Sequence, residues 1–539
     1  MKILFLIQFS LLICLNNLIG QPWEKIYGVS GRFDEFKNLS ETYDGGFILL
    51  GAHDYFPDTR GWLIKVDING NKLYDLTIGL NNGFGQLNLP LSISQTSDGG
   101  NILCTGQGPD YLGDIGVIKL DPCGNLEWCK VFNTPVDPDW GVEIKQLQDG
   151  GYVLLTMGYD YTFNNPRIHL FRLNPSGEVL WIEPYATTAN NPYISYNDPY
   201  DLVVTPDEDF FISGLCYWCD EPAGTGGTTN KCRLKAMTIL ADSSRQEEWV
   251  SVYKASDTLS YSFAGWATQH ESGSFYVGAV DQTIWPNSMP RLLKYDINGN
   301  LIGDSLVNIP MIDNKWAEGF MVNPSFTEDG KLFTCTRFVD ENTSYPGWFG
   351  LHELDSLGGW HNSIIHPTAH APVGLIVTSD NKLLAGAVIG SDFNQDIILM
   401  KFNTSLEYDS IYTAPREYDY LCPDPIVSKT IDLSDCEVIV DVKDIPTRKE
   451  YEARISLIPI TPAPNPASGN LRFLLENTEY HSKIRVVCYD IQGRQLAELP
   501  VNSGIHETGL DVSRWRPGMY MAVVYAGNKQ MGKTRFVVE

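Results

Sequence analysis

Three histidines that lie close together in the sequence are its nearest approach to a metal site. Imidazole nitrogens are common ligands of transition metals, and the set consists of His361, His366 and His370. On an extended chain, these spacings put His366 and His370 on one face and His361 on the other. We therefore predict no metal site, and we keep His370 as a candidate ligand-binding residue.

Tryptophans and acids form a second candidate site. Several tryptophans recur at one position of a repeated unit, which indicates packing: Trp23, Trp128, Trp181, Trp249 and Trp360. Trp140, Trp266 and Trp316 do not recur, and they stand where the chain enters a new copy of the unit. With Asp139 and Asp201 they predict an aromatic and acidic rim that binds an extracellular glycan or protein. Ordinary packing between neighbouring units is the alternative for each residue.

The sequence contains no motif for catalysis. It has no nucleophile elbow, no His-Glu-x-x-His pattern, no phosphate-binding loop and no acids at a spacing typical of an active site. We predict no catalytic residue and no cofactor. Carboxylates from different copies of the unit could still meet in space, so a glycoside hydrolase or lyase remains an alternative. A structural component of the cell surface is a third.

Two segments, Asp67–Asn71 and Asp296–Asn300, share part of a calcium-loop pattern. Both lack the later acidic ligands that such a loop needs. Asn-Gly at this point is also the preferred turn of a β-hairpin. We therefore predict hairpins rather than calcium sites.

These residues are embedded in a repeat built around Asp-Gly-Gly and a short apolar run. Asp bonds its local backbone and Gly accepts positive φ, so each copy predicts a tight turn leading into a buried strand. The copies are separated by 51 to 65 residues. Their marks are Asp44, Asp98, Asp149, Asp207, Ser272, Asp329 and Asp380.

Each copy also contains a strand with charged residues on alternate positions, a Gly-Asn or Asn-Gly hairpin and a last strand with an aromatic residue. That makes four short strands per copy and no helical period. Seven four-stranded sheets are typical of a β-propeller, because the coils of the rival β-solenoid are usually shorter. We predict an all-β, seven-bladed propeller over residues 21–414.

The N-terminus is typical of a secretory signal peptide at residues 1–20, with a charged start and a short apolar core. The segment Trp23–Gly28 then copies the last strand of a unit, which predicts that the N-terminus completes the final blade and closes the ring. The final copy also contains a segment of this kind, at Leu406–Tyr412. The last strand of the final blade could therefore come from either segment, and both arrangements stay open.

Composition limits the class of partner. The net charge of −27 and the lack of a basic run argue against nucleic acid, which needs clustered Lys and Arg. After the leader, no apolar stretch approaches membrane length, so we predict no transmembrane segment. Acidity of this kind suits a solvated extracellular surface.

Cysteine usage fits an oxidising compartment, since removal of the leader leaves ten of the 11 cysteines. Cys123 and Cys129 flank a hairpin that they could bridge. Cys422 and Cys436 form a second predicted pair, within a connecting segment at residues 415–461. The cluster of Cys216, Cys219 and Cys232 lacks a fourth ligand nearby, which favours a disulfide and a spare thiol over zinc. Cys219 and Cys232 are our candidates for that disulfide.

The tail at residues 462–539 opens with Pro464, Asn465 and Pro466 after a break in the pattern. Short alternating strands and glycine hairpins predict a small β-sandwich. The further positions that carry a family pattern are Gly493, Gly518, Tyr520 and Lys533. In these residues the tail resembles the type A C-terminal sorting domain of the type IX secretion system. The resemblance implies export by that machinery across the outer membrane, followed by release or attachment at the surface.

Overall fold

The computed structural model describes residues 22–29, 31–53, 60–79, 89–107, 114–132, 140–160, 165–186, 191–220, 222, 232–241, 248–254, 261–284, 287–340, 347–391, 394–413, 422, 425–439, 445–447, 451, 458–476, 478, 483–502, 504–527 and 529–539. The predicted leader lies outside these residues. The chain forms two compact units, Met1–Ile445 and Pro446–Glu539. All named elements are β-strands. The described residues include no helix long and apolar enough to cross a membrane.

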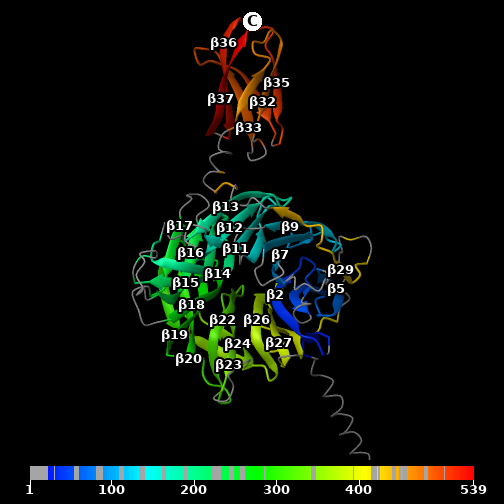
Figure 1. Ribbon diagram of the computed structural model, residues 1–539, viewed down its shortest axis with the longest axis vertical. Coiled ribbons are helices and arrows are strands. Elements are labelled where there is room, and N and C mark those ends of the chain that lie inside the picture. The colour runs from blue at the N-terminus through cyan, green and yellow to red at the C-terminus, as the bar shows by residue number, and fades with distance from the viewer. Residues whose placement is uncertain are drawn as a thin grey trace, which may run out of the picture. The chain divides into compact units, whose positions relative to one another are not determined.

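The first unit is a seven-bladed β-propeller of antiparallel four-stranded sheets, which Figure 1 shows arranged in a circle. Blade 1 consists of β2 (Asp34–Glu41), β3 (Phe47–His53), β4 (Arg60–Val66) and β5 (Lys72–Ile78). Blade 2 consists of β6 (Leu89–Gln95), β7 (Asn101–Gln107), β8 (Asp114–Leu120) and β9 (Leu126–Phe132). Blade 3 consists of β10 (Trp140–Gln146), β11 (Tyr152–Asp160), β12 (Asn165–Leu173) and β13 (Val179–Tyr185). Blade 4 consists of β14 (Ile194–Val204), β15 (Phe210–Cys219), β16 (Cys232–Ala241) and β17 (Glu248–Val252).

The remaining blades follow the same order. Blade 5 consists of β18 (Tyr261–Gln269), β19 (Phe275–Ile284), β20 (Asn287–Tyr295) and β21 (Leu301–Leu306). Blade 6 consists of β22 (Trp316–Phe326), β23 (Leu332–Val339), β24 (Trp348–Leu354) and β25 (Trp360–Ile365). Blade 7 consists of β26 (Ala369–Val377), β27 (Leu383–Ser391), β28 (Asn394–Phe402) and the N-terminal β1 (Glu24–Tyr27).

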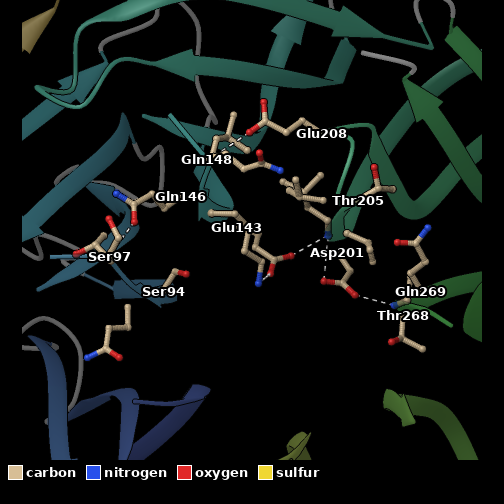
Figure 2. A pocket seen from close by; sticks show the side chains of 18 of the residues that line it. Ser94, Ser97, Glu143, Gln146, Gln148, Asp201, Thr205, Glu208, Thr268 and Gln269 are labelled. Carbon is tan, nitrogen blue, oxygen red and sulfur yellow. Dashed lines mark hydrogen bonds and ion pairs between the residues drawn. The ribbon is translucent and has the colours of Figure 1, made fainter. Parts of the chain in front are cut away.

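The first strands of the blades line the axis, and each contacts the next around the circle, with β26 returning to β2. The Asp-Gly-Gly turns fasten this inner ring. The backbone N–H of Ser97 in blade 2 donates to Gln146 Oε1 of blade 3 at 2.7 Å (Figure 2). Ser379 in blade 7 donates likewise to Glu41 of blade 1. Neighbouring blades are therefore joined by hydrogen bonds as well as by apolar packing.

An ion pair joins the Asp-Gly-Gly turn to the charged third strand of the same blade. In blade 1, Lys65 Nζ on the third strand lies 2.8 Å from Oδ1 of Asp44 in the turn. The same pairing occurs in three other blades, as Lys119–Asp98, Arg172–Asp149 and Lys401–Asp380. The charged residue on the third strand therefore turns inward to its own blade's turn.

The hairpins predicted in place of calcium sites are present. Asp67 Oδ1 accepts the backbone N–H groups of Asn69 and Asn71 at 2.8 and 2.7 Å. Asp296 binds Asn298 and Asn300 in the same way. The carboxylate oxygens that a calcium ion would need are thus engaged by the turn itself.

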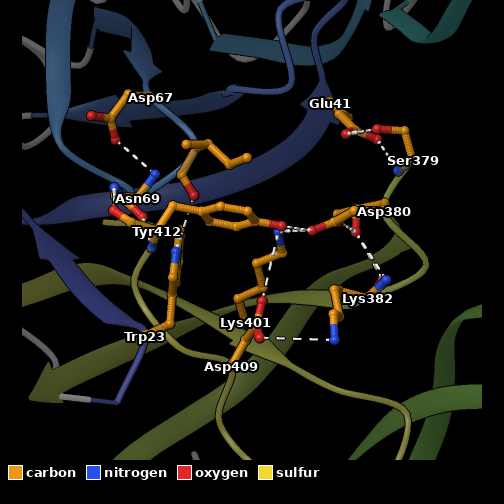
Figure 3. Close-up of polar contacts among 12 residues, drawn as sticks. Trp23, Glu41, Asp67, Asn69, Ser379, Asp380, Lys382, Lys401, Asp409 and Tyr412 are labelled. Atoms are coloured by element: carbon orange, nitrogen blue, oxygen red, sulfur yellow. Dashed lines mark hydrogen bonds and ion pairs between the residues drawn. The ribbon is translucent and has the colours of Figure 1, made fainter. Parts of the chain in front are cut away.

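The N-terminus closes the ring by completing blade 7, as one of the two predicted arrangements required. β1 pairs antiparallel with β28, and Trp23 is fully buried with its indole N–H on Ile68 O at 3.0 Å. The competing segment makes an isolated bridge through Tyr408 and then turns to blade 1, where Tyr412 exchanges two hydrogen bonds with Asn69 (Figure 3). Both chain segments therefore pin blade 7 to blade 1.

The connecting segment forms a strap over blades 1 and 2. β29 (Lys429–Ile431) pairs parallel with β5, and β30 (Glu437–Ile439) pairs parallel with β9, so both outer edges gain a fifth strand. Edge strands covered in this way cannot pair with another chain.

The disulfides correct two predicted pairings. The structure joins Cys123 to Cys422 and Cys129 to Cys436, so the pairs Cys123–Cys129 and Cys422–Cys436 are wrong. Cys129 lies beyond the turn with Ile118 as its cross-strand partner, out of reach of Cys123. The extended β29 lies between the two strap cysteines and separates them. Cys219 does pair with Cys232 across β15 and β16, and Cys216 is a buried thiol.

The second unit is a β-sandwich. One sheet contains β31 (Ile460–Ala463), β32 (Asn470–Leu475) and β35 (Glu507–Asp511). The other contains β33 (Ile484–Tyr489), β34 (Gln495–Val501), β36 (Gly518–Ala526) and β37 (Lys529–Val538). Leu471 and Phe473 of the first sheet pack on Val486, Val524 and Phe536 of the second. The core reaches back to Ile458, so the sandwich begins before the predicted boundary at residue 462.

The predicted sorting residues have structural roles in this sandwich. Asn465 Oδ1 accepts the N–H of Val537 at 2.8 Å between two prolines, Pro464 and Pro466. Gly493 has φ +80 in the turn between β33 and β34, where a side chain would be strained. Tyr520 stacks on Phe536 and donates to Arg516 O. Gly518 is the first residue of β36. Lys533 lies on β37 and is exposed.

Candidate functional site

Three adjoining cavities line the inner strands of the propeller. The largest has about 1070 Å³ and lies beside the Asp-Gly-Gly turns of blades 2 and 3. It shares Glu143, Asp201 and Asn323 with a cavity of about 300 Å³. That cavity shares Tyr200 and Trp266 with a third, of about 410 Å³. The three cavities adjoin through these shared residues, and the channel region that they line is the candidate site.

A β-bulge in each inner strand shapes the middle of the channel. The ladder slips between Phe36 and Asn38 in β2 and between Pro199 and Asp201 in β14, with equivalent slips in β6, β10, β18, β22 and β26. A bulge inserts a residue and re-aims side chains. The residues at five of these bulges line the 300 Å³ cavity, namely Lys37, Leu91, Val142, Tyr200 and Trp266.

The 410 Å³ cavity is lined by both apolar and polar groups. Phe263, Trp266 and Val322 provide aromatic and aliphatic side chains. The lining also includes an ion pair in which Arg337 Nη2 donates to Glu318 Oε2 at 3.2 Å. A pocket of this size and composition is typical of a small-ligand site, where apolar walls hold the ligand and a few polar groups orient it.

Glu143 and Asp201 bring two acids from different blades together where the cavities join (Figure 2). Both residues are buried, and a hydrogen bond links their carboxyl groups. Glu143 also accepts the N–H of Leu202 at 2.7 Å, and Asp201 accepts the N–H of Ala267 in blade 5 at 2.6 Å. The pair therefore ties blades 3, 4 and 5 together.

Lys145 forms an ion pair with one of the two acids, Glu143. Its Nζ lies 2.5 Å from Glu143 Oε1. Burial alone would raise the pKa of Glu143, but the Lys145 charge and the hydrogen bonds from Asp201 and Leu202 hold that pKa below its usual range. Burial and the adjacent Glu143 charge raise the pKa of Asp201 well above its usual range. These opposite shifts favour an ionised Glu143 beside a protonated Asp201.

Asp198 is a third acid in the same cavity, with fewer partners. Its Oδ2 accepts a long hydrogen bond from the Tyr196 hydroxyl, at 3.4 Å. Burial raises the pKa of Asp198 to about 6, although the Tyr196 bond works in the other direction. Its charge therefore changes within the physiological range.

The predicted rim residues fall into two groups. Asp201 and Trp266 line the channel together. Trp316 begins β22, and His370 near the start of β26 donates from Nδ1 to Gly347 O at 2.9 Å. Neither is among the described residues that line the three cavities. Trp140 is the first residue of β10, and its side chain, like the whole of Asp139, lies outside the described residues.

The three histidines have separate surroundings in the structure. His366 donates from Nε2 to Glu24 at 3.1 Å and accepts the N–H of Ala369 at Nδ1, so it helps to hold the N-terminal strand. His361 is exposed near Asp355. Within the described ranges, no three His, Cys, Asp or Glu side chains are grouped to hold a metal ion.

The sequence reasoning missed Glu143, Lys145, Asp198 and the Glu318–Arg337 pair. One signal was available, because Glu143 and Lys145 alternate on an inner strand, where a propeller points alternate residues at its axis. The bulges carry no such signal.

Comparison with known proteins identifies the tail. Residues 463–539 match the family described as secretion system C-terminal sorting domain. No curated protein matches the chain. The tail is thus a type IX sorting domain, and it directs export across the outer membrane to the cell surface or the medium.

Solved structures resemble the all-β architecture at low identity. A Dyadobacter fermentans protein of unknown function is 11% identical with a TM-score of 0.42, over 62% of this chain and 98% of that one. The GH93 α-L-arabinofuranosidase of Fusarium graminearum is 10% identical with a TM-score of 0.36, over 59% and 93%. Likenesses at this level carry no argument about activity.

Proposed function

Starting from a chain that its sorting domain sends across the outer membrane, we propose that the propeller is an extracellular carbohydrate-binding module with its site in the central channel. The observation that carries this proposal is the 410 Å³ cavity, whose lining combines Trp266 and Phe263 with the Glu318–Arg337 pair. A sugar has an apolar face that stacks on aromatic rings and a rim of hydroxyls that charged side chains bind.

The dimensions favour a sugar over a folded protein partner. A stable protein interface buries about 800 Å² on each side and is formed by a broad surface. The channel instead offers concave spaces of about 300 and 410 Å³, within or near the range that encloses small ligands. A glycan end can enter such a space while the rest of the polymer stays outside.

A channel hydrolase or lyase is the second candidate, favoured by the three carboxyl groups that line one cavity. Glycosidases separate their two acids by about 5–5.5 Å or about 6.5–9.5 Å. Glu143 and Asp201 are instead hydrogen-bonded to each other and hold backbone N–H groups of neighbouring blades. These contacts support a role in joining blades, and they leave binding as the better-supported function.

The test compares two tryptophan variants. Purified protein is screened against extracellular glycans, hits are titrated by calorimetry, and each mixture is examined for products. We expect Trp266→Ala to weaken binding about tenfold or more through loss of its stacking surface. Trp316→Ala, a change at a tryptophan away from the cavities, should bind like the unmodified protein.

Equal loss of affinity in both variants, or no glycan hit at all, would refute the assignment. Products formed from a bound glycan would instead establish the hydrolase or lyase alternative.

A further inference from the structure

The 300 Å³ cavity, here called the carboxyl chamber, has the lining of a site for an organic cation. Tyr200 and Trp266 contribute aromatic rings, and Asp198, Glu143 and Asp201 contribute carboxyl groups. Aromatic faces attract ammonium groups within about 6 Å through the ring quadrupole, most strongly when water is displaced. Carboxylates bind the same groups by charge-assisted hydrogen bonds.

The net charge of the chamber depends on a single residue. Glu143 is neutralised by Lys145 at 2.5 Å, and Lys37 is paired with Glu35 at 2.5 Å. Burial and the Glu143 charge raise the pKa of Asp201, which favours its neutral form. Asp198 remains, and its ionisation therefore sets whether the chamber is neutral or negative.

Asp198 is also placed to bind a ligand. Among the described residues, the Asp198 carboxyl receives only the long hydrogen bond from Tyr196 at Oδ2, and its Oδ1 has no protein partner. The β-bulge of β14, where the register shifts between Pro199 and Asp201, follows directly after Asp198. Tyr200 of this bulge lines the chamber together with Asp198. A half-buried carboxylate with a free oxygen lowers the stability of the fold unless a ligand compensates it, a pattern common at binding sites.

We propose that the carboxyl chamber binds an organic ammonium group, with Asp198 as its charged partner and Tyr200 and Trp266 as its aromatic walls. The inference rests on the proposed function, because the 410 Å³ cavity adjoins the chamber through the same two aromatic residues. The ammonium group belongs to an amino sugar at the end of the bound glycan. Uronic acids and other anionic ends are excluded by the charge of Asp198.

The experiment titrates the full protein with three probes by calorimetry, at about pH 5 and about pH 7, on either side of the Asp198 pKa. The probes are glucosamine oligomers, their N-acetylated counterparts and tetramethylammonium, whose charge does not change with pH. We expect tetramethylammonium to bind on the order of tenfold more tightly at the higher pH, because Asp198 is then ionised and a contact to an ionised group is the stronger one. Glucosamine oligomers should gain less, because their amines begin to lose protons near neutral pH. Asp198→Asn should abolish this gain.

Asp432→Asn is the matched control, because Asp432 is an exposed acid on the strap and its carboxylate accepts the N–H of Ser434, which an amide oxygen can also do. It should leave all three affinities unchanged. Equal binding of amino and N-acetylated oligomers at both pH values would overturn the ammonium site and leave the carbohydrate function standing. If tetramethylammonium binds and no oligomer does, the carbohydrate function is overturned and the ammonium site is kept. No binding by any probe would overturn both.

Discussion

Replacing Lys65 with Met isolates the ion pair that the two repeat signatures build. The Lys65 and Asp44 side chains are 6% and 4% exposed, and Lys65 Nζ also donates to Thr42 at 2.6 Å. Met keeps most of the apolar stem and removes the charge. Asp44 then remains ionised and buried without its cation, which costs about 3–5 kcal/mol.

The same change in blade 2 gives the comparison. Lys119 is as buried as Lys65, but its partner Asp98 is 50% exposed. Water solvates Asp98 when the cation is removed, so Lys119→Met should cost about 1 kcal/mol for the pair. The structure thus predicts a difference of about 2–4 kcal/mol between two substitutions at equivalent positions of one repeat.

Denaturant unfolding followed by tryptophan fluorescence measures this difference. Of the 13 tryptophans, all but Trp515 lie in the first unit, so the signal reports the propeller. Burial alone would raise the pKa of Asp44, but Lys65, Thr42 and Gly46 hold it below its usual value. The contribution of the pair is therefore complete near pH 7 and is lost as pH falls.

Removing the second charge provides the internal check. Asn at position 44 keeps the oxygen that accepts the N–H of Gly46 at 2.9 Å, so Asp44→Asn preserves the turn. The double variant Asp44→Asn with Lys65→Met should recover at least half of the single variant's loss. Equal costs for Lys65→Met and Lys119→Met, or a double variant as unstable as the sum of its parts, would refute the reasoning.

Two further predictions concern Asp198 and the strap. The folded-state pKa of Asp198 is about 6 against an ordinary 3.8, so the protein loses stability as pH rises between these values. Asp198→Asn should be more stable by about 3 kcal/mol at pH 7 and equal near pH 3 by calorimetric unfolding, and no gain at pH 7 would contradict the assignment. Peptide mapping without reduction should link Cys123 to Cys422 and Cys129 to Cys436, whereas a Cys422–Cys436 peptide would refute both. With Cys123–Cys422 intact, Cys129–Cys436 closes only the short segments 123–129 and 422–436, so Cys129→Ser with Cys436→Ser should cost about 3 kcal/mol.

The blades could be predicted because their information is local. An Asp-Gly-Gly turn or an Asp67-type hairpin is specified by a few neighbouring residues that bond to one another. Copies at a regular spacing then imply stacked sheets whatever their contacts. The sorting tail could be predicted for a related reason, since its family pattern spans the whole of a small domain.

The disulfides and the channel could not be predicted in the same way. Cys129 and Cys436 are 307 residues apart, and only the parallel pairing of β30 with β9 brings them together. The predicted rim residues stand where the chain enters a blade, whereas the residues that line the channel depend on bulges in the strands. The predicted blade order makes blades 3 and 4 neighbours, but it does not specify which side chains meet between them, and so the contact of Glu143 with Asp201 was not predicted.

The strap also determines how the molecule carries mechanical load. A pull on the chain after residue 445 enters the first unit at that residue, and the first covalent branch it meets is Cys436. From there the force passes into blade 2 through Cys129, with Cys422–Cys123 as a second anchor in the same blade. The seam between β1 and β28, held only by hydrogen bonds and packing, lies off this path. Such a pull therefore reaches the two disulfides of the strap before it reaches the hydrogen-bonded closure of the ring.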